Sequence, residues 1–160
     1  MTYEEIVKLV AENNQSKEFS NEFVTCLIWK ETSFEPSEKN SKSSATGLMQ
    51  MTKGAVEMVN RCSPKNVHFE HSEMTDAVKN VQCGTLYLDI AKNKLGGVDA
   101  SYGTGPGYSR GIVTCESCLQ SDAVHYQAAL SASRSALARI RVTVCSTHAG
   151  NRRRTSTVKV

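Results

Sequence analysis

The chain has 160 residues, 39% of them hydrophobic, which suits one domain with its own core and excludes a second domain of ordinary size. Its apolar runs are too short to cross a membrane, and its acidic start predicts that no signal peptide is present. The net charge of +3 is unevenly spread: residues 1–131 hold all 16 acidic residues and 12 of the 19 basic ones, whereas residues 132–160 hold only basic charge.

The spacing of apolar residues predicts a mainly helical domain. Ser20 is a suitable cap for a helix that runs into Glu31. Residues 35–46 are rich in Ser, Lys and Asn and contain Pro36, so they favour an exposed loop. The expected helices cover about residues 2–13, 20–31, 48–60, 75–94 and 109–130.

Glycines mark the end of the fourth helix and the segment after it. Gly96 and Gly97 should end that helix, and residues 102–108 contain three glycines, which favour a tight turn. Beyond residue 131 the composition changes, and alternating apolar residues predict a small C-terminal β-hairpin. We therefore divide the chain into a helical domain, 1–131, and a basic tail, 132–160, whose origin the sequence leaves open.

Glu31 is the first candidate for chemistry. It follows Val24, Leu27 and Ile28 by seven, four and three residues, so a helix places its carboxyl on the apolar face. Loss of water there should raise the pKa of the carboxyl and keep a proton available near neutral pH. Such an acid can protonate a leaving-group oxygen, as glycoside cleavage requires. The alternative is a glutamate that turns outward into solvent.

Three motifs, the first of them in two parts, add context to Glu31. Residues 31–36 read Glu-Thr-Ser-Phe-Glu-Pro, and residues 47–50 read Gly-Leu-Met-Gln. Residues 76–88 match the spacing Asp-x-x-x-Asn-x-x-x-Gly-x-x-Tyr-Leu, and residues 100–107 read Ala-Ser-Tyr-Gly-Thr-Gly-Pro-Gly. In this order, over about residues 20–110, they resemble the lysozyme-like lytic transglycosylases, whose domain is helical and cleaves the glycan strands of peptidoglycan. The resemblance implies a lysozyme-like fold of the soluble lytic transglycosylase and goose-type class.

The resemblance also implies roles for individual residues. Glu31 would be the general acid and then the base, and Tyr102 would lie against it and orient it. Ser41 and Gln50 would bind sugar groups beside the scissile β-1,4 bond between N-acetylmuramic acid and N-acetylglucosamine. Met49 is expected at the substrate, with core filling as its alternative. The residues expected to support the motifs are Gly47, Asn80, Gly105 and Gly107, and no cofactor or metal is implied.

Several positions depart from the family. Thr32 replaces a serine and keeps the hydroxyl, whereas Gly103 replaces an asparagine and removes a polar contact from the groove. Most glycosidases use two carboxylates, but lytic transglycosylases use one because the muramoyl 6-hydroxyl of the substrate is the nucleophile. No second acid lies at a family position, and Glu57, Glu73 and Asp76 are candidates by proximity to the motifs only. The sequence therefore leaves transglycosylase and hydrolase both open.

The six cysteines and the expected absence of a leader bear on localisation. An even cysteine count fits disulfides in an oxidising compartment. A small cell-wall enzyme of this kind is similar to the glycoside-hydrolase effectors that type VI secretion delivers into a rival's periplasm. That hypothesis implies a cognate immunity protein that occludes the groove. A phage lysozyme and a periplasmic enzyme trimmed of its leader remain alternatives.

Other classes of function use different residues. Cys115, Cys118, Cys145 and His148 are of the type that binds zinc in an interaction module. Cys26 with His68, His71 or His125 would suit a cysteine amidase, and a glycan-binding module would need no acid. The tail has three consecutive arginines but no aromatic residue among them, so specific nucleic-acid binding is not expected.

Overall fold

A computed structural model describes residues 1–103 and 105–132, and no side chain is described for residues 124–132. This part of the chain is helical. Its only β-structure is two isolated β-bridges. None of its helices is long and apolar enough to span a bilayer. The elements are α1 (Tyr3–Asn13), α2 (Asn21–Thr32), α3 (Lys53–Cys62), the 3₁₀ turn η1 (His71–Glu73), α4 (Ala77–Lys94), α5 (Val98–Ser101) and α6 (Arg110–Ala132).

Side-chain caps explain where four of the helices begin. In each case an oxygen of the capping residue accepts a hydrogen bond from a backbone N–H of the first turn, which has no partner inside the helix. In α1 the bond is reciprocal, because Glu5 also accepts from the backbone of Thr2. The capping residues are Thr2, Ser20, Thr52 and Asp76.

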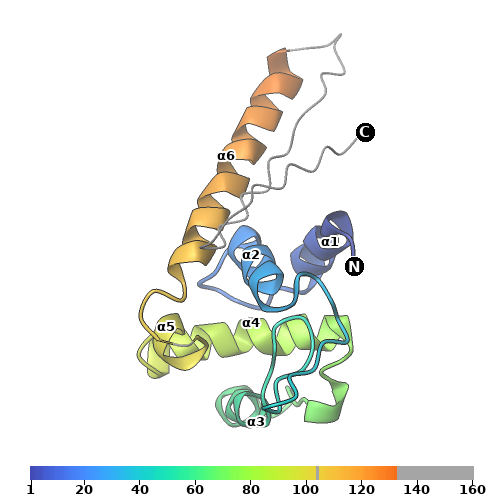
Figure 1. The fold of residues 1–160 in the computed structure, drawn as a ribbon, viewed down its shortest axis with the longest axis vertical. Helices are drawn as coiled ribbons and strands as arrows, with labels where there is room; N and C mark the ends of the chain where they lie inside the picture. The colour runs from blue at the N-terminus through green and yellow to red at the C-terminus, as the bar shows by residue number, and fades with distance from the viewer. Residues whose placement is uncertain (104, 133–160) are drawn as a thin grey trace.

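Helix α4 lies across the base of α1 and α2 and also contacts α3 and α5 (Figure 1). Helix α2 packs on α1 and on the first part of α6, which extends away from the other helices (Figure 1). A disulfide between Cys26 and Cys115 joins α2 to α6. The helix that carries Glu31 is therefore held from two sides.

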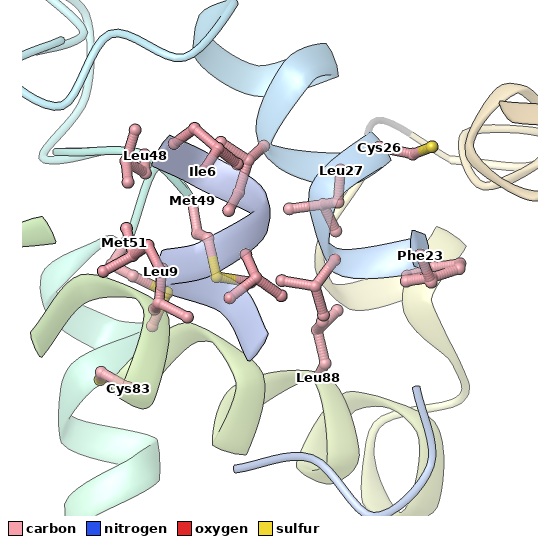
Figure 2. Close-up of a cluster of buried hydrophobic side chains, with 14 of the residues drawn as sticks. Ile6, Leu9, Phe23, Cys26, Leu27, Leu48, Met49, Met51, Cys83 and Leu88 are labelled. Carbon is pink, nitrogen blue, oxygen red and sulfur yellow. The ribbon is translucent and has the colours of Figure 1, made fainter. Parts of the chain in front are cut away.

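One apolar cluster fills the space between α1, α2 and α4 (Figure 2). It includes three residues of the segment between α2 and α3, and each is at most 1% exposed: Leu48, Met49 and Met51. The side chain of Met49 reaches between the helices in Figure 2. This segment is therefore built into the core although it forms no helix.

The expected elements agree with the structure except near residue 48. Helices α1, α2, α4 and α6 lie within about two residues of their predicted bounds, whereas the third begins at Lys53 rather than at residue 48. Residues 47–50 form turns, since Gly47 and Gln50 have positive φ angles, 77° and 48°. Helix α5 was not predicted. The predicted hairpin and the basic tail lie outside the described residues.

Candidate functional site

Glu31 lies in the last turn of α2, and its side chain is half-buried. Burial raises the pKa of the Glu31 carboxyl, while a hydrogen bond from Tyr108 and the charge of Lys30 act in the opposite direction. The sequence-based expectation of a raised pKa thus agrees with this environment. The carboxyl therefore keeps its proton to a higher pH than an exposed glutamate does, which is the direction that general-acid chemistry requires.

The chain turns sharply directly after Glu31. Ser33 and Phe34 both have positive φ angles, 51° and 72°, which residues other than glycine rarely adopt. Phe34 is buried, with its ring 5.0 Å from that of Trp29. The Thr32 hydroxyl lies within hydrogen-bond distance of the carbonyls of Ile28 and Leu48. Packing and hydrogen bonding therefore compensate the unusual backbone and fix the end of α2.

Tyr108 donates the hydrogen bond that reaches the Glu31 carboxyl, from its hydroxyl to Oε1. This corrects the expectation that Tyr102 orients Glu31, because the Tyr102 hydroxyl donates to the backbone carbonyl of Met49 instead. The two tyrosine rings are stacked, with centroids 6.4 Å apart. Tyr102 thus lies next to the orienting residue and connects it to residues 47–50.

Asn80 holds the 47–50 segment from below. Its side-chain oxygen accepts from Met49 N at 2.8 Å, and its amide nitrogen donates to the carbonyls of Thr46 and Met74 at 3.0 and 2.8 Å. A side chain on Gly47 would begin 2.0 Å from the carbonyl oxygen of Met74. The motif residues Gly47 and Asn80 are therefore required by close packing and buried hydrogen bonds.

The structure places the Met49 side chain in the core. It is fully buried, and a side chain at Gly84 would begin 2.5 Å from its Sδ atom. The expectation that the Met49 side chain contacts substrate is corrected: core packing, the alternative considered from sequence, is what the structure shows. The backbone carbonyl of Met49 accepts the hydrogen bond of the Tyr102 hydroxyl.

Gln50 and Ser41, the two expected sugar contacts, lie on the segment between α2 and α3. The side-chain NH₂ of Gln50 donates to the carbonyls of Gly47 and Glu38 at 3.0 and 3.3 Å, and Gln50 directly follows the residue that Tyr102 binds. Ser41 is exposed in the turn after Asn40. Gln50 is thus connected to the Glu31 surroundings through Met49 and the tyrosines, while Ser41 has no such connection in the described residues.

The segment before α6 is held by Asp99, a residue that sequence analysis did not single out. Its two carboxylate oxygens accept from the backbone N–H groups of Gly107 and Ser109, each at 2.7 Å. A hydrogen bond from the Ser109 side chain, together with these two backbone hydrogen bonds, lowers the pKa of Asp99. Gly105 and Gly107 have φ angles of 118° and 89°, which explains the glycines of the motif. Together they place Tyr108 between two anchored amides.

The three acids considered as a second catalytic carboxylate are engaged in other contacts or are exposed away from Glu31. Glu73 forms an ion pair with Lys79, and Asp76 caps α4. Glu57 is exposed on α3. Within the described residues, no carboxylate contributes to the pKa shift of Glu31. The site thus offers one acid, with a tyrosine as its direct partner.

The disulfide bears on both cysteine-based alternatives. Cys26 and Cys115 are bonded to each other, so Cys26 is not a thiol nucleophile and Cys115 is not a zinc ligand. Burial raises the pKa of the Cys83 thiol to about 12, which makes it unreactive. The histidines proposed for those sites are engaged elsewhere: His68 pairs with Glu70, and His71 binds the carbonyls of Ser44 and Met51. Cys145, His148 and the side chain of His125 lie outside the description.

Comparison with known protein families decides the relationship. The model of the transglycosylase SLT domain family matches residues 8–112, more than half of the chain and all of the motifs above. The chain belongs to this family.

Solved structures of the same family agree with the helical architecture. The 70 kDa soluble lytic transglycosylase of Escherichia coli superposes with a TM-score of 0.53 at 22% identity, over 67% of this chain and 18% of that one. The complex of the 70-kDa soluble lytic transglycosylase with bulgecin A superposes with a TM-score of 0.53 at 21% identity, over 69% of this chain and 18% of that one. The chain therefore spans under a fifth of those proteins. No curated protein sequence matches it. The predicted lysozyme-like fold of this SLT domain is confirmed.

Sequence analysis missed Tyr108, Lys30 and Asp99 as members of the site. The available signal was proximity: Tyr108 directly follows the last glycine of the motif, and Lys30 directly precedes Glu31. Neither position belongs to the family pattern, so only the folded chain reveals that the Lys30 ammonium lies 4.4 Å from the centre of the Tyr108 ring.

Proposed function

We propose that this SLT domain is a lytic transglycosylase that cleaves peptidoglycan glycan strands at the β-1,4 bond between N-acetylmuramic acid and N-acetylglucosamine. The observation that carries the proposal is the Glu31 carboxyl. It is half-buried, has a raised pKa and accepts a hydrogen bond from Tyr108, and no second carboxylate acts on it in the described residues. A site with one acid suits a reaction in which the substrate supplies the nucleophile.

In the proposed mechanism Glu31 acts twice. Its proton passes to the glycosidic oxygen as the bond to C1 of the muramoyl unit breaks, and the N-acetylglucosamine leaves as an alcohol. The resulting carboxylate then accepts the proton of the muramoyl 6-hydroxyl, whose oxygen bonds to C1 and closes a 1,6-anhydro ring. The proton returns to Glu31, so no water is consumed.

We assign sugar binding to Gln50 and Ser41. The NH₂ group of Gln50 is occupied by two backbone carbonyls, so its side-chain oxygen is the atom we assign to a sugar hydroxyl or N-acetyl N–H. Ser41 is exposed and free to meet a sugar farther along the strand. Substitution of either residue should raise KM more than it lowers kcat.

The test is digestion of purified peptidoglycan by the wild type and by Glu31→Gln, with mass spectrometry of the fragments. Anhydromuramoyl ends that disappear in the variant are the expected result. Reducing ends that disappear in the variant would instead identify a hydrolase, and the sugar that carries them would name the bond. Cleavage unchanged by the substitution would overturn the role of Glu31.

Bulgecin A offers a second probe of the same site. Because a 70-kDa relative was crystallised with it, we propose that it binds here as well. Saturable binding that competes with glycan fragments is the expected outcome in calorimetry, and no binding at millimolar concentration would count against the likeness of the two sites.

We propose further that the protein acts in the periplasm as an antibacterial effector, delivered for example by type VI secretion and neutralised by an immunity protein that covers the Glu31 site. The Cys26–Cys115 disulfide supports an oxidising compartment. Expression with an added periplasmic leader should lyse Escherichia coli, whereas cytoplasmic expression should not. Co-expression of the adjacent gene should protect the cells. An in-frame leader upstream of the gene would refute this route.

A further inference from the structure

Gly103 leaves open the space that the Tyr108 ring fills. A side chain there would begin 2.0, 2.4 and 2.5 Å from Cγ, Cβ and Cδ1 of Tyr108. Such contacts are not possible between real atoms, so any other residue at 103 must move Tyr108. The φ angle of Gly103 is not in the positive region, so space rather than backbone geometry requires the glycine. This is the position at which the family motif carries asparagine.

The remaining contacts of Tyr108 hold it in one orientation. The Lys30 ammonium donates to the Tyr108 carbonyl at 3.0 Å and lies over its ring. Asp99 binds the backbone N–H groups on either side of Tyr108, and Tyr102 stacks against its ring. The backbone and the ring are therefore both fixed independently of the hydroxyl contact with Glu31.

The contact with the Tyr108 hydroxyl makes the two oxygens of the Glu31 carboxyl inequivalent. Oε1 accepts from Tyr108, so the acidic proton is left on Oε2, which becomes the oxygen that serves the scissile bond. Burial and the charge of Glu31 raise the pKa of Tyr108, which keeps its hydroxyl protonated as a donor. The donor persists when Glu31 becomes the base, and it stabilises that charged form.

We propose that Tyr108, admitted by the missing side chain of Gly103, is the residue that positions the Glu31 carboxyl in this chain, in place of Tyr102. The expected effect of Tyr108 on turnover rests on the proposed function. The orientation of the carboxyl itself can be measured without substrate.

Three single variants separate the contributions. Tyr108→Phe removes only the hydroxyl on Glu31, and Gly103→Ala displaces the ring. Tyr102→Phe is the matched control, because it removes a hydroxyl from the adjacent ring that binds the Met49 carbonyl. The groups that face Glu31 in the described residues are Lys30 on its own helix and the two tyrosines of the α5–α6 segment, so these variants leave the charge of Lys30 unchanged.

The first readout is the titration of the Glu31 carboxyl by ¹³C NMR, with its resonance assigned from Glu31→Gln. Tyr108→Phe and Gly103→Ala should both raise the pKa, because each removes a bond that stabilises the charged form. Tyr102→Phe should shift it less. The same spectra show whether each variant is folded. A pKa that moves with Tyr102→Phe and not with Tyr108→Phe would overturn the proposal.

The second readout is turnover of peptidoglycan as a function of pH. Tyr108→Phe should lower kcat by about tenfold to a hundredfold with KM unchanged. The alkaline limb of the pH profile, where Glu31 loses its proton, should move to higher pH. When Tyr108→Phe is already present, adding Gly103→Ala should lower kcat little further. Independent losses from the two changes would contradict the proposal. If the wild type cleaves no glycan, the proposed function fails, while the titration still decides the role of Tyr108.

Discussion

The side-chain oxygen of Asn80 accepts a hydrogen bond from the backbone N–H of Met49, and the same residue donates to two more backbone carbonyls. Asn80 is fully buried, so water cannot replace these bonds once the side chain is removed. We expect Asn80→Ala to lower the free energy of unfolding by about 3 kcal/mol or more. Urea unfolding measures the change. Asn60→Ala is the control: Asn60 is half-buried and exchanges two hydrogen bonds with the backbone of Phe69, so a loss of about 1 kcal/mol is expected there.

Three Gly→Ala substitutions should differ strongly in stability. Gly47→Ala meets a backbone carbonyl and requires a positive φ, so it should lower the melting temperature the most. Gly84→Ala meets the flexible Met49 side chain and should cost about 1–3 kcal/mol. Gly54→Ala, in the first turn of α3, meets nothing within 4 Å and should stabilise slightly. Thermal unfolding ranks them, and an equal effect at 47 and 54 would contradict the packing argument.

The stability of the domain should depend on the charge of Glu31. Its pKa in the fold is raised by burial, so the protonated form is favoured in the native state. The protonated carboxyl therefore adds to the free energy of unfolding. This stabilisation is fully present below the pKa of an unfolded glutamate, about 4.3, and is lost as the pH rises through the pKa of Glu31 in the fold. Glu31→Gln should therefore be more stable than the wild type at pH 7 and equal to it at pH 3.5. A wild type that gains stability relative to the variant as pH rises would exclude the assigned direction.

Removal of the Cys26–Cys115 disulfide should destabilise the fold substantially. The bond closes a loop with a sequence separation of 89, for which chain entropy predicts a contribution of about 4.6 kcal/mol. The double variant Cys26→Ala/Cys115→Ala and the reduced wild type should unfold at similarly low urea concentrations. Cys62→Ser, at an exposed free thiol, should unfold like the wild type. If reduction leaves the urea midpoint unchanged, α2 and α6 are held together by packing alone.

Much of the helical framework could be predicted from local sequence. The capping residues Ser20 and Asp76 and the apolar faces of α1 and α2 are encoded within a few residues of where they act. Glu31 could be placed on the buried side of α2 for the same reason. The exception was the 48–60 helix: Leu48 and Met51 have helical spacing, but they face the core from a turn.

The contacts within the site could not be predicted in the same way. Which tyrosine reaches Glu31 depends on the path of the α5–α6 segment. That path is set by Asp99, which lies 8 and 10 residues before the two residues whose N–H groups it binds. The family motif suggested Tyr102, although the absent side chain of Gly103 allows Tyr108 to take the contact. The pairing of Cys26 with Cys115 depends equally on how α2 and α6 pack, which no spacing rule gives.

Trp29 is the single tryptophan of the chain, and its indole packs on Phe34 across the turn that follows Glu31. Tryptophan fluorescence of the unlabelled protein therefore originates at one place, two residues from the proposed acid. A glycan that closes over that turn, or a solvent change that loosens it, would alter the emission directly. The molecule carries its own optical reporter for the binding step, so a stopped-flow trace could time substrate arrival separately from bond cleavage.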